Sequence, residues 1–235
     1  MLVWLGLMAM GAVPSSEAPQ VVDRVVAEVG DEVITLSELI AETGWVLVRT
    51  RGPEVALEGG LPRSLLRSVL EAMVNSQLLL HELRRLQLED VDQGAVDEEF
   101  KRFAGRFASE ERAAAFYASF GYEQPEPGRA PPLLERRIRI DLRVDQFIAV
   151  RLDPKVELAD VQRCLRVEES RFEGTSPAEA RRRVTERLRA QLQERALDRL
   201  LADLRSQTRV VFTPGYGPIP GTRPGAEFTC PLPDG

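Results

Sequence analysis

The sequence contains one histidine and two cysteines, the side chains that most often build metal centres or nucleophilic pairs. His81 lies between Leu80 and Glu82, and the cysteines, Cys164 and Cys230, are far apart in the chain. A conventional zinc site draws three or four ligands mostly from these two residue types. The sequence therefore predicts no such zinc site, and no Cys/His catalytic pair except one that uses His81 itself.

We interpret His81 as a surface or boundary residue of a leucine-rich helix, because no second histidine and no serine or cysteine nucleophile is placed beside it. No catalytic residue, metal ligand or cofactor is assigned. The two cysteines permit a disulfide that would pin the C-terminal tail to the body, and equally permit two unpaired thiols.

A cluster of carboxylates follows this helix and raises the question of a cation site. It lacks the glycine-centred spacing of a calcium loop. A connector followed by a helix N-terminus, where acidic residues are favourable, explains it more simply. The residues are Glu89, Asp90, Asp92, Asp97, Glu98 and Glu99.

An arginine cluster, Arg181–Arg183 with Arg187 and Arg189, lies in the last helical segment. Pairs at a spacing of four residues, such as Glu179–Arg183, favour a solvated helix face. The alternative is an electropositive flank that docks a partner or the acidic helices of the same molecule.

Half of the aromatic residues lie in one short stretch, where a helical stripe of phenylalanines is usually core. In a protein that binds unfolded chains, such residues can instead line an exposed apolar groove. We favour core packing, and we take the stretch as the candidate peptide-binding surface. Its residues are Phe100, Phe103, Phe107, Phe116, Tyr117 and Phe120, with Tyr122 directly after them.

Composition narrows the class of protein further. The chain has 235 residues, 43% of them hydrophobic, and a net charge of −6. That is enough apolar material for a folded core, whereas the acidic balance argues against neutralising nucleic-acid phosphates along an extended face. We expect no nucleic-acid partner.

The first residues have features of an export signal. Residues 2–13 form an apolar run that is too short to span a bilayer, and Ser16-Glu17-Ala18 supplies small residues near a cleavage position. No Lys or Arg precedes the run, so a buried N-terminal strand is the alternative. We expect residues 1–18 to be a signal peptide, and the mature chain to have no stable membrane insertion.

Two short β-type segments, 21–29 and 32–35, flank Gly30-Asp31 and predict a hairpin. Thr35 precedes Glu38 by three residues, which is the spacing of a capping box, so a helix should follow. A third β-type run, 208–212, closes the chain before a tail, 214–235, that is rich in proline and glycine and should be flexible.

Between these strands, apolar residues recur at helical spacing. The segment 51–61 should be a loop, because it contains Gly52, Pro53, Gly59 and Gly60. The predicted helices are 37–48, 62–86, 96–107, 109–120, 134–151, 158–166 and 176–205, the last with Ser176 as N-cap and Pro177 at its first position.

The order of these segments resembles the periplasmic chaperone–isomerase family typified by SurA. The most distinctive part is VDRVVAEVGDEVITLSELIA at 22–41, followed by VLEAMVNSQLLLHELRRLQLEDVDQGAVDEEFKRF at 69–103. Segments 135–150 and 178–212 are similar to the later helices and closing strand of that family.

The resemblance implies a mainly α fold: a helical chaperone core of the SurA/trigger-factor type with a small sheet that joins the N-terminal hairpin to the C-terminal strand. A lone hairpin is marginal in water, so this pairing is physically reasonable. We expect it to bury Val25, Ala27 and Val29. The expected domain is 19–213, with an N-terminal part 19–151, a linker 152–175, and a final helix and strand 176–213.

One departure from the family bears on activity. Members with isomerase activity carry a parvulin-type domain where this chain has only residues 151–175, too few for an α/β domain with its own core. Parvulin sites also use histidines, and His81 lies elsewhere. The isomerase activity is therefore not transferred.

The resulting functional prediction is a periplasmic, ATP-independent, non-catalytic holdase whose partners are unfolded outer-membrane or exported proteins. The alternatives are a peptidyl-prolyl cis–trans isomerase of the SurA/PpiC type and a dedicated assembly adaptor for one envelope protein.

Overall fold

A computed structural model of the chain describes residues 23–86, 90–126 and 128–217. The predicted signal peptide, 1–18, and most of the predicted tail, including Cys230, lie outside the described residues. Within them the chain is mainly α-helical with one small antiparallel sheet, which confirms the predicted fold class.

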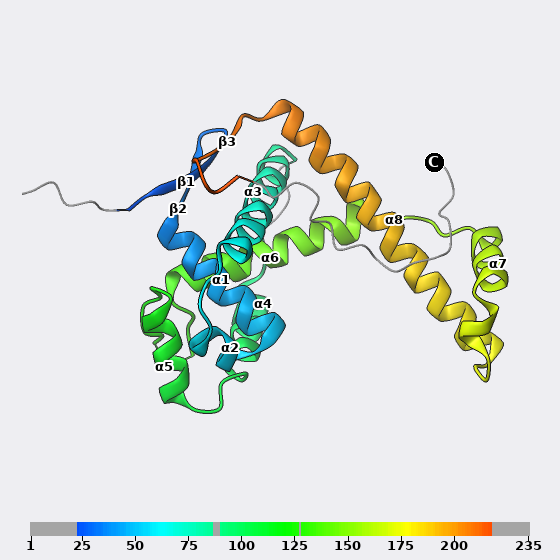
Figure 1. Ribbon diagram of the computed structural model, residues 1–235, viewed down its shortest axis with the longest axis horizontal. Coiled ribbons are helices and arrows are strands. Elements are labelled where there is room, and N and C mark those ends of the chain that lie inside the picture. The colour runs from blue at the N-terminus through cyan, green and yellow to red at the C-terminus, as the bar shows by residue number, and fades with distance from the viewer. Residues whose placement is uncertain (1–22, 87–89, 127, 218–235) are drawn as a thin grey trace, which may run out of the picture.

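Figure 1 labels the helices and strands in chain order. They are β1 (Val25–Val29), β2 (Glu32–Thr35), α1 (Leu36–Arg51), α2 (Pro53–Glu58), α3 (Arg63–Arg85), α4 (Gln93–Ala104), α5 (Glu110–Ser119), α6 (Pro132–Arg151), α7 (Leu158–Val167), the 3₁₀ helix η1 (Glu169–Phe172), α8 (Pro177–Gln207) and β3 (Val210–Phe212).

Both predicted N-caps are present. The hydroxyl of Thr35 accepts a hydrogen bond from the Glu38 amide, and the Glu38 carboxylate accepts one from the Thr35 amide, which completes the capping box of α1. At α8, the Ser176 hydroxyl accepts from the Glu179 amide at 3.3 Å. These bonds satisfy amides that have no partner inside their own helix.

The segment 51–61 is not simply a loop, because it contains the short helix α2. Pro53 takes the first helical position, where its fixed φ is favourable and the missing N–H costs nothing, and Glu54 occupies the first turn. Ala56 faces inward and is 3% exposed. The glycines that predicted a loop act instead as boundaries: Gly52, at φ 92°, ends α1, and Gly59 ends α2.

The two ends of the described chain meet in the sheet, whose strand order is β2-β1-β3. Glu28 on β1 pairs with Val33 on β2 and with Val211 on β3, and both strands run antiparallel to β1. The Thr213 hydroxyl adds a hydrogen bond to the Val25 carbonyl at 2.9 Å. The predicted pairing of hairpin and closing strand is confirmed.

The expected burial of Val25 is wrong, although Ala27 and Val29 are buried as expected. The pairing register shifts between Val25 and Ala27, which is a β-bulge. A bulge places an extra residue in one strand and reverses the alternation of faces. Val26 and Ala27 are therefore both buried, whereas Val25 remains 39% exposed.

Three apolar clusters lie along the molecule. The first joins the sheet to α3 and to the C-terminal halves of α6 and α8. The second packs α1 and α2 against α4, α5 and the start of α6, and contains the aromatic residues. The third is small and joins α7 to the N-terminal half of α8 through Val161, Cys164, Val184 and Leu188.

Helix α8 connects the first cluster to the third. At 1.5 Å per residue its 31 residues span about 46 Å. Figure 1 shows it running from β3 past the body to α7, as an extended arm. Beyond β3, residues 214–217 turn back towards α3, where the Arg67 guanidinium donates to the Gly215 carbonyl at 3.0 Å.

Candidate functional site

The aromatic stretch forms one wall of a surface groove of about 720 Å³. The groove lies between α4, α5 and the loop that follows α5. Its lining residues are Phe100, Ala104, Phe107, Ser109, Glu110, Ala113, Ala114, Tyr117, Gln124, Pro125, Glu126 and Gly128, and we call it the aromatic groove.

Local sequence signals set the shape of this groove. Ser109 caps α5 by accepting from the Arg112 amide at 3.3 Å. Gly121 has a φ of 74°, a conformation that glycine adopts without strain, and turns the chain after α5. The returning segment is held to α5 by Gln124, whose side-chain amide donates to the Ala114 carbonyl at 3.2 Å.

The six predicted peptide-binding residues divide into two groups. Phe100, Phe107 and Tyr117 line the aromatic groove. Phe103, Phe116 and Phe120 lie beneath it in the second apolar cluster, where each is at most 5% exposed.

Phe116 packs against the lining rings through edge and tilted contacts, and two of those lining residues, Phe100 and Tyr117, are themselves only 7% and 2% exposed. The Phe116 ring lies 5.3 Å from that of Phe107 and 5.8 Å from that of Tyr117, measured between centroids. Such pairs are each worth about 0.5–1.5 kcal/mol beyond the burial of their area. The groove therefore has a rigid aromatic floor.

Tyr117 is the polar group of this floor. Burial raises its pKa to about 12, because the phenolate is poorly solvated there. Its hydroxyl makes no hydrogen bond within the described part of the chain, and it is not among the polar atoms sealed from solvent. The phenol is therefore a neutral donor that an occupant of the groove can satisfy.

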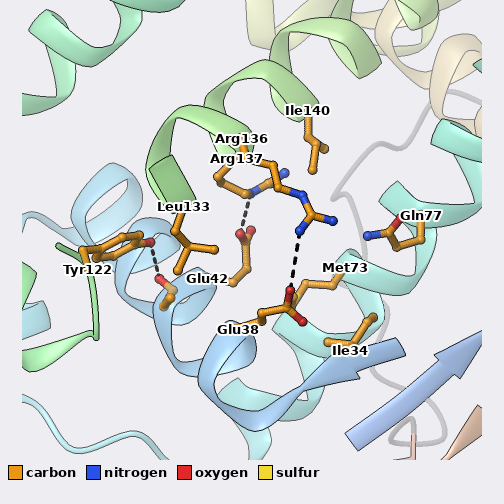
Figure 2. Close-up of a pocket in the computed structure, with 11 residues that line it drawn as sticks. Ile34, Glu38, Glu42, Met73, Gln77, Tyr122, Leu133, Arg136, Arg137 and Ile140 are labelled. Carbon is orange, nitrogen blue, oxygen red and sulfur yellow. Dashed lines mark hydrogen bonds and ion pairs between the residues drawn. The ribbon is translucent and has the colours of Figure 1, made fainter. Parts of the chain in front are cut away.

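A second site, which sequence reasoning missed, is a mostly apolar pocket with several charged side chains between α1, α3 and α6, shown in Figure 2. Its cavity is small, about 60 Å³. Ile34, Met73 and Ile140 supply part of its apolar lining, and Glu38 faces Arg136 across it at 3.8 Å. This volume suits a few water molecules rather than an organic ligand.

Glu42 is the buried charge of this pocket. It is 5% exposed and forms an ion pair with Arg137. Arg137 also contacts Asp141 at 2.5 Å, and Asp141 accepts a hydrogen bond from the Trp45 indole at 3.0 Å and one from Arg49 at 2.8 Å. This network fastens α1 to α6.

Desolvation raises the pKa of Glu42 to about 7, and the neighbouring Asp141 adds to the rise, against the opposing effect of Arg137. The sequence offered one signal for this site: Glu42 is the only acid between Ala41 and Val48, a stretch that is mostly buried in the structure. The partners on α6 have no local signature, so the network was not predictable.

His81 and the arginine cluster, which the sequence singled out, lie on helices α3 and α8. His81 is exposed on α3, at a cleft beside the β1–β2 turn, with Arg84 and Arg85. Glu179 pairs with Arg182 and Arg183 at 2.9 Å and 2.7 Å, which confirms the predicted Glu179–Arg183 pair, whereas Arg187 of the same cluster pairs with the buried Glu168 at 2.8 Å. Among the described residues, no group of three or more His, Cys, Asp or Glu side chains is placed to hold a metal ion.

Cys164 lies fully buried between α7 and α8. The pairing with Cys230 that the sequence permits falls outside the described residues. No helix in the described ranges is both long enough and apolar enough to cross a bilayer.

Comparison with family models and with curated proteins finds no match to this chain. The site's geometry must therefore carry the functional argument.

Proposed function

We propose that the protein is a periplasmic holdase of the SurA type, which binds unfolded outer-membrane or exported proteins without catalysis and without ATP. The aromatic groove carries this proposal. It offers a rigid apolar floor of Phe100, Phe107 and Tyr117 at the surface of a helical body.

The energetics of such a groove suit reversible binding. Burying about 100 Å² of a client's apolar surface contributes about 2.5 kcal/mol. A few side chains bound at once give weak, broadly selective association after the entropic cost of ordering the client. Client release then needs no external energy source.

The fold supports the family resemblance on which the periplasmic part of the proposal rests. The N-terminal hairpin and the closing strand share one sheet, as the resemblance implies. Where isomerase members carry a catalytic domain, residues 152–175 contain α7 and η1, and α7 packs on α8. This arrangement favours binding over prolyl isomerisation.

Suppression of aggregation tests the proposal. A denatured outer-membrane protein is diluted into buffer with and without the full chain, and light scattering is followed. The test variant is Ala114→Trp, which fills the groove from α5. The matched control is Ala115→Trp, at an exposed neighbour that does not line the groove.

Wild type and Ala115→Trp should suppress scattering at comparable molar ratios, and Ala114→Trp should require several-fold more protein. No suppression by wild type at several-fold molar excess would contradict the holdase function. Equal suppression by all three proteins would show that the aromatic groove does not take part in the holdase function.

One observation favours a second candidate, the dedicated assembly adaptor. Leu158 and Val167, the first and last residues of α7, are 59% and 55% exposed, and Val150, near the end of α6, is 74% exposed. A fixed partner would cover such residues better than transient clients. Native mass spectrometry of complexes captured from a periplasmic extract separates the two, because an adaptor gives one stoichiometric partner and a holdase gives many.

A further inference from the structure

The charge around the aromatic groove is one-sided. Among the described residues, the charged side chains that line it are Glu110, in the first turn of α5, and Glu126, in the loop after α5. Both are exposed, and within the described residues neither forms an ion pair. The apolar floor thus shares the groove with two carboxylates that are free to pair with an occupant.

Several cations lie near the groove in the chain, but none of them lines it. Arg129 directly follows the lining residue Gly128 and is exposed, and its amide donates to the Glu126 carbonyl at 3.0 Å. Arg112, on α5, pairs with Glu54 and Glu58 of α2. Arg106, after α4, donates to the Arg49 carbonyl at 3.3 Å. Lys101 is exposed on α4 and is not a lining residue.

A polar contact is also available at the floor. The Tyr117 hydroxyl has no hydrogen-bond partner among the described residues, and the residue is 2% exposed. The hydroxyl oxygen is not sealed from solvent, so a ligand's carbonyl can reach it and replace water as its hydrogen-bond acceptor. An extended peptide supplies such carbonyls at regular spacing, whereas a compact apolar ligand does not.

We propose that the aromatic groove selects extended peptide segments in which an aromatic or aliphatic residue is flanked by arginine or lysine. This inference rests on the proposed holdase function and adds the chemistry of the client to it. The apolar side chain packs on Phe100 and Phe107, the Tyr117 hydroxyl donates to the peptide backbone, and Glu110 and Glu126 pair with the flanking cations.

The test measures binding of short dye-labelled peptides to the full chain by fluorescence anisotropy. Three peptides share one aromatic core and differ only in their flanking residues, which are arginine, glutamine or glutamate. Two exposed ion pairs should make the arginine peptide bind about fivefold more tightly than the glutamine peptide. The glutamate peptide should bind most weakly, and added salt should reduce the differences.

The double variant Glu110→Gln/Glu126→Gln should bind the three peptides almost equally and keep the wild-type affinity for the glutamine peptide. The control, Glu111→Gln/Glu123→Gln, removes two nearby exposed carboxylates that do not line the groove and should keep the preference.

The outcomes separate this inference from the proposed function. Binding of all three peptides with equal affinity to the wild type overturns the charge preference and leaves the holdase function standing. A preference that survives in the double variant also overturns it. If none of the peptides binds and aggregation is not suppressed, both proposals fail together.

Discussion

Gly44, in the middle of α1, lies directly against the ring of Phe120 at the end of α5. A β-carbon on residue 44 would lie only 2.8 Å from Cε1 of that ring and closer still to two other ring carbons. Real β-carbons essentially never approach another atom so closely. The absence of a side chain at Gly44 therefore lets the aromatic cluster under the groove pack onto α1.

Substituting Gly44 with alanine should destabilise the protein. Alanine gains helix propensity over glycine, but the overpacking forces the buried Phe120 ring to move, and the net loss should be about 2 kcal/mol. Urea unfolding followed by circular dichroism measures it. Gly60→Ala is the control: a β-carbon there meets nothing within 4 Å, so its free energy of unfolding should be unchanged or slightly higher.

The buried carboxyl of Glu42 should make stability depend on pH. Burial raises its pKa in the folded protein to about 7, above the ordinary glutamate pKa of 4.5. Between these values the native state holds a proton that the unfolded state has released. The Glu42 contribution is therefore fully present below pH 4.5 and is lost as pH rises through 7.

The size of this contribution is about 3 kcal/mol for a shift of that magnitude. Denaturant unfolding at a series of pH values, compared between wild type and Glu42→Gln, isolates it from other titrating groups. The difference between the two proteins should change between pH 4.5 and 7 and be flat above pH 8. A constant difference across the range would show that Glu42 does not hold a proton in the folded state. Glu98→Gln, which removes an exposed carboxylate of α4, should keep the wild-type slope.

The features of the fold that the sequence could predict depend on interactions between residues close together in the chain. The N-caps at Thr35 and Ser176, the glycine turn of the hairpin and the apolar spacing of the long helices act within a few residues, so most of the elements and their order followed from them. Even there, the bounds of α4 differ from the predicted 96–107. The helix begins at Gln93, directly after its N-cap residue Asp92, and it ends at Ala104, directly before Gly105.

What the sequence could not predict depends on contacts between distant segments. Trp45 and Asp141, which help to fasten α1 to α6, are 96 residues apart. The division of the aromatic residues into a floor and a buried support depends on how the segment after α5 folds back. The exposure of Val25 depends on a bulge, and a one-residue change of register exchanges the faces of a strand.

The arm formed by α7 and α8 should depend on Glu168. Its side chain is 1% exposed and pairs with Arg187 of α8 at 2.8 Å. Replacing Glu168 with alanine leaves a guanidinium without this carboxylate, which should cost about 2 kcal/mol because Arg187 is partly exposed. Hydrogen exchange should show lost protection in α7 and unchanged protection in β1. The control, Arg189→Ala, breaks an exposed pair with Asp153 and should change little.

The closure of the sheet gives a backbone test. The Gly30 amide donates to the Arg209 carbonyl, and the Thr213 amide donates to the Val26 carbonyl. Hydrogen-bonded pairs recur at every second residue of an antiparallel ladder, so Val211 and Glu28, which lie between these two bonds, are also a hydrogen-bonded pair. Val211→Pro removes that donor and should cost about 2 kcal/mol. In the alternating pattern of β2, Val33 directs its amide away from β1, so Val33→Pro should cost much less. Equal losses of unfolding free energy would contradict this register.

The most direct measurement of the central claim is site-specific photo-crosslinking to a client. A photoreactive phenylalanine analogue replaces Phe107, which lines the aromatic groove, or Ala115, which lies outside it, and the protein is irradiated with an unfolded outer-membrane protein. The account predicts strong crosslinks from position 107 and weak ones from position 115. Equal crosslinking from both positions, or crosslinking only from position 115, would contradict it.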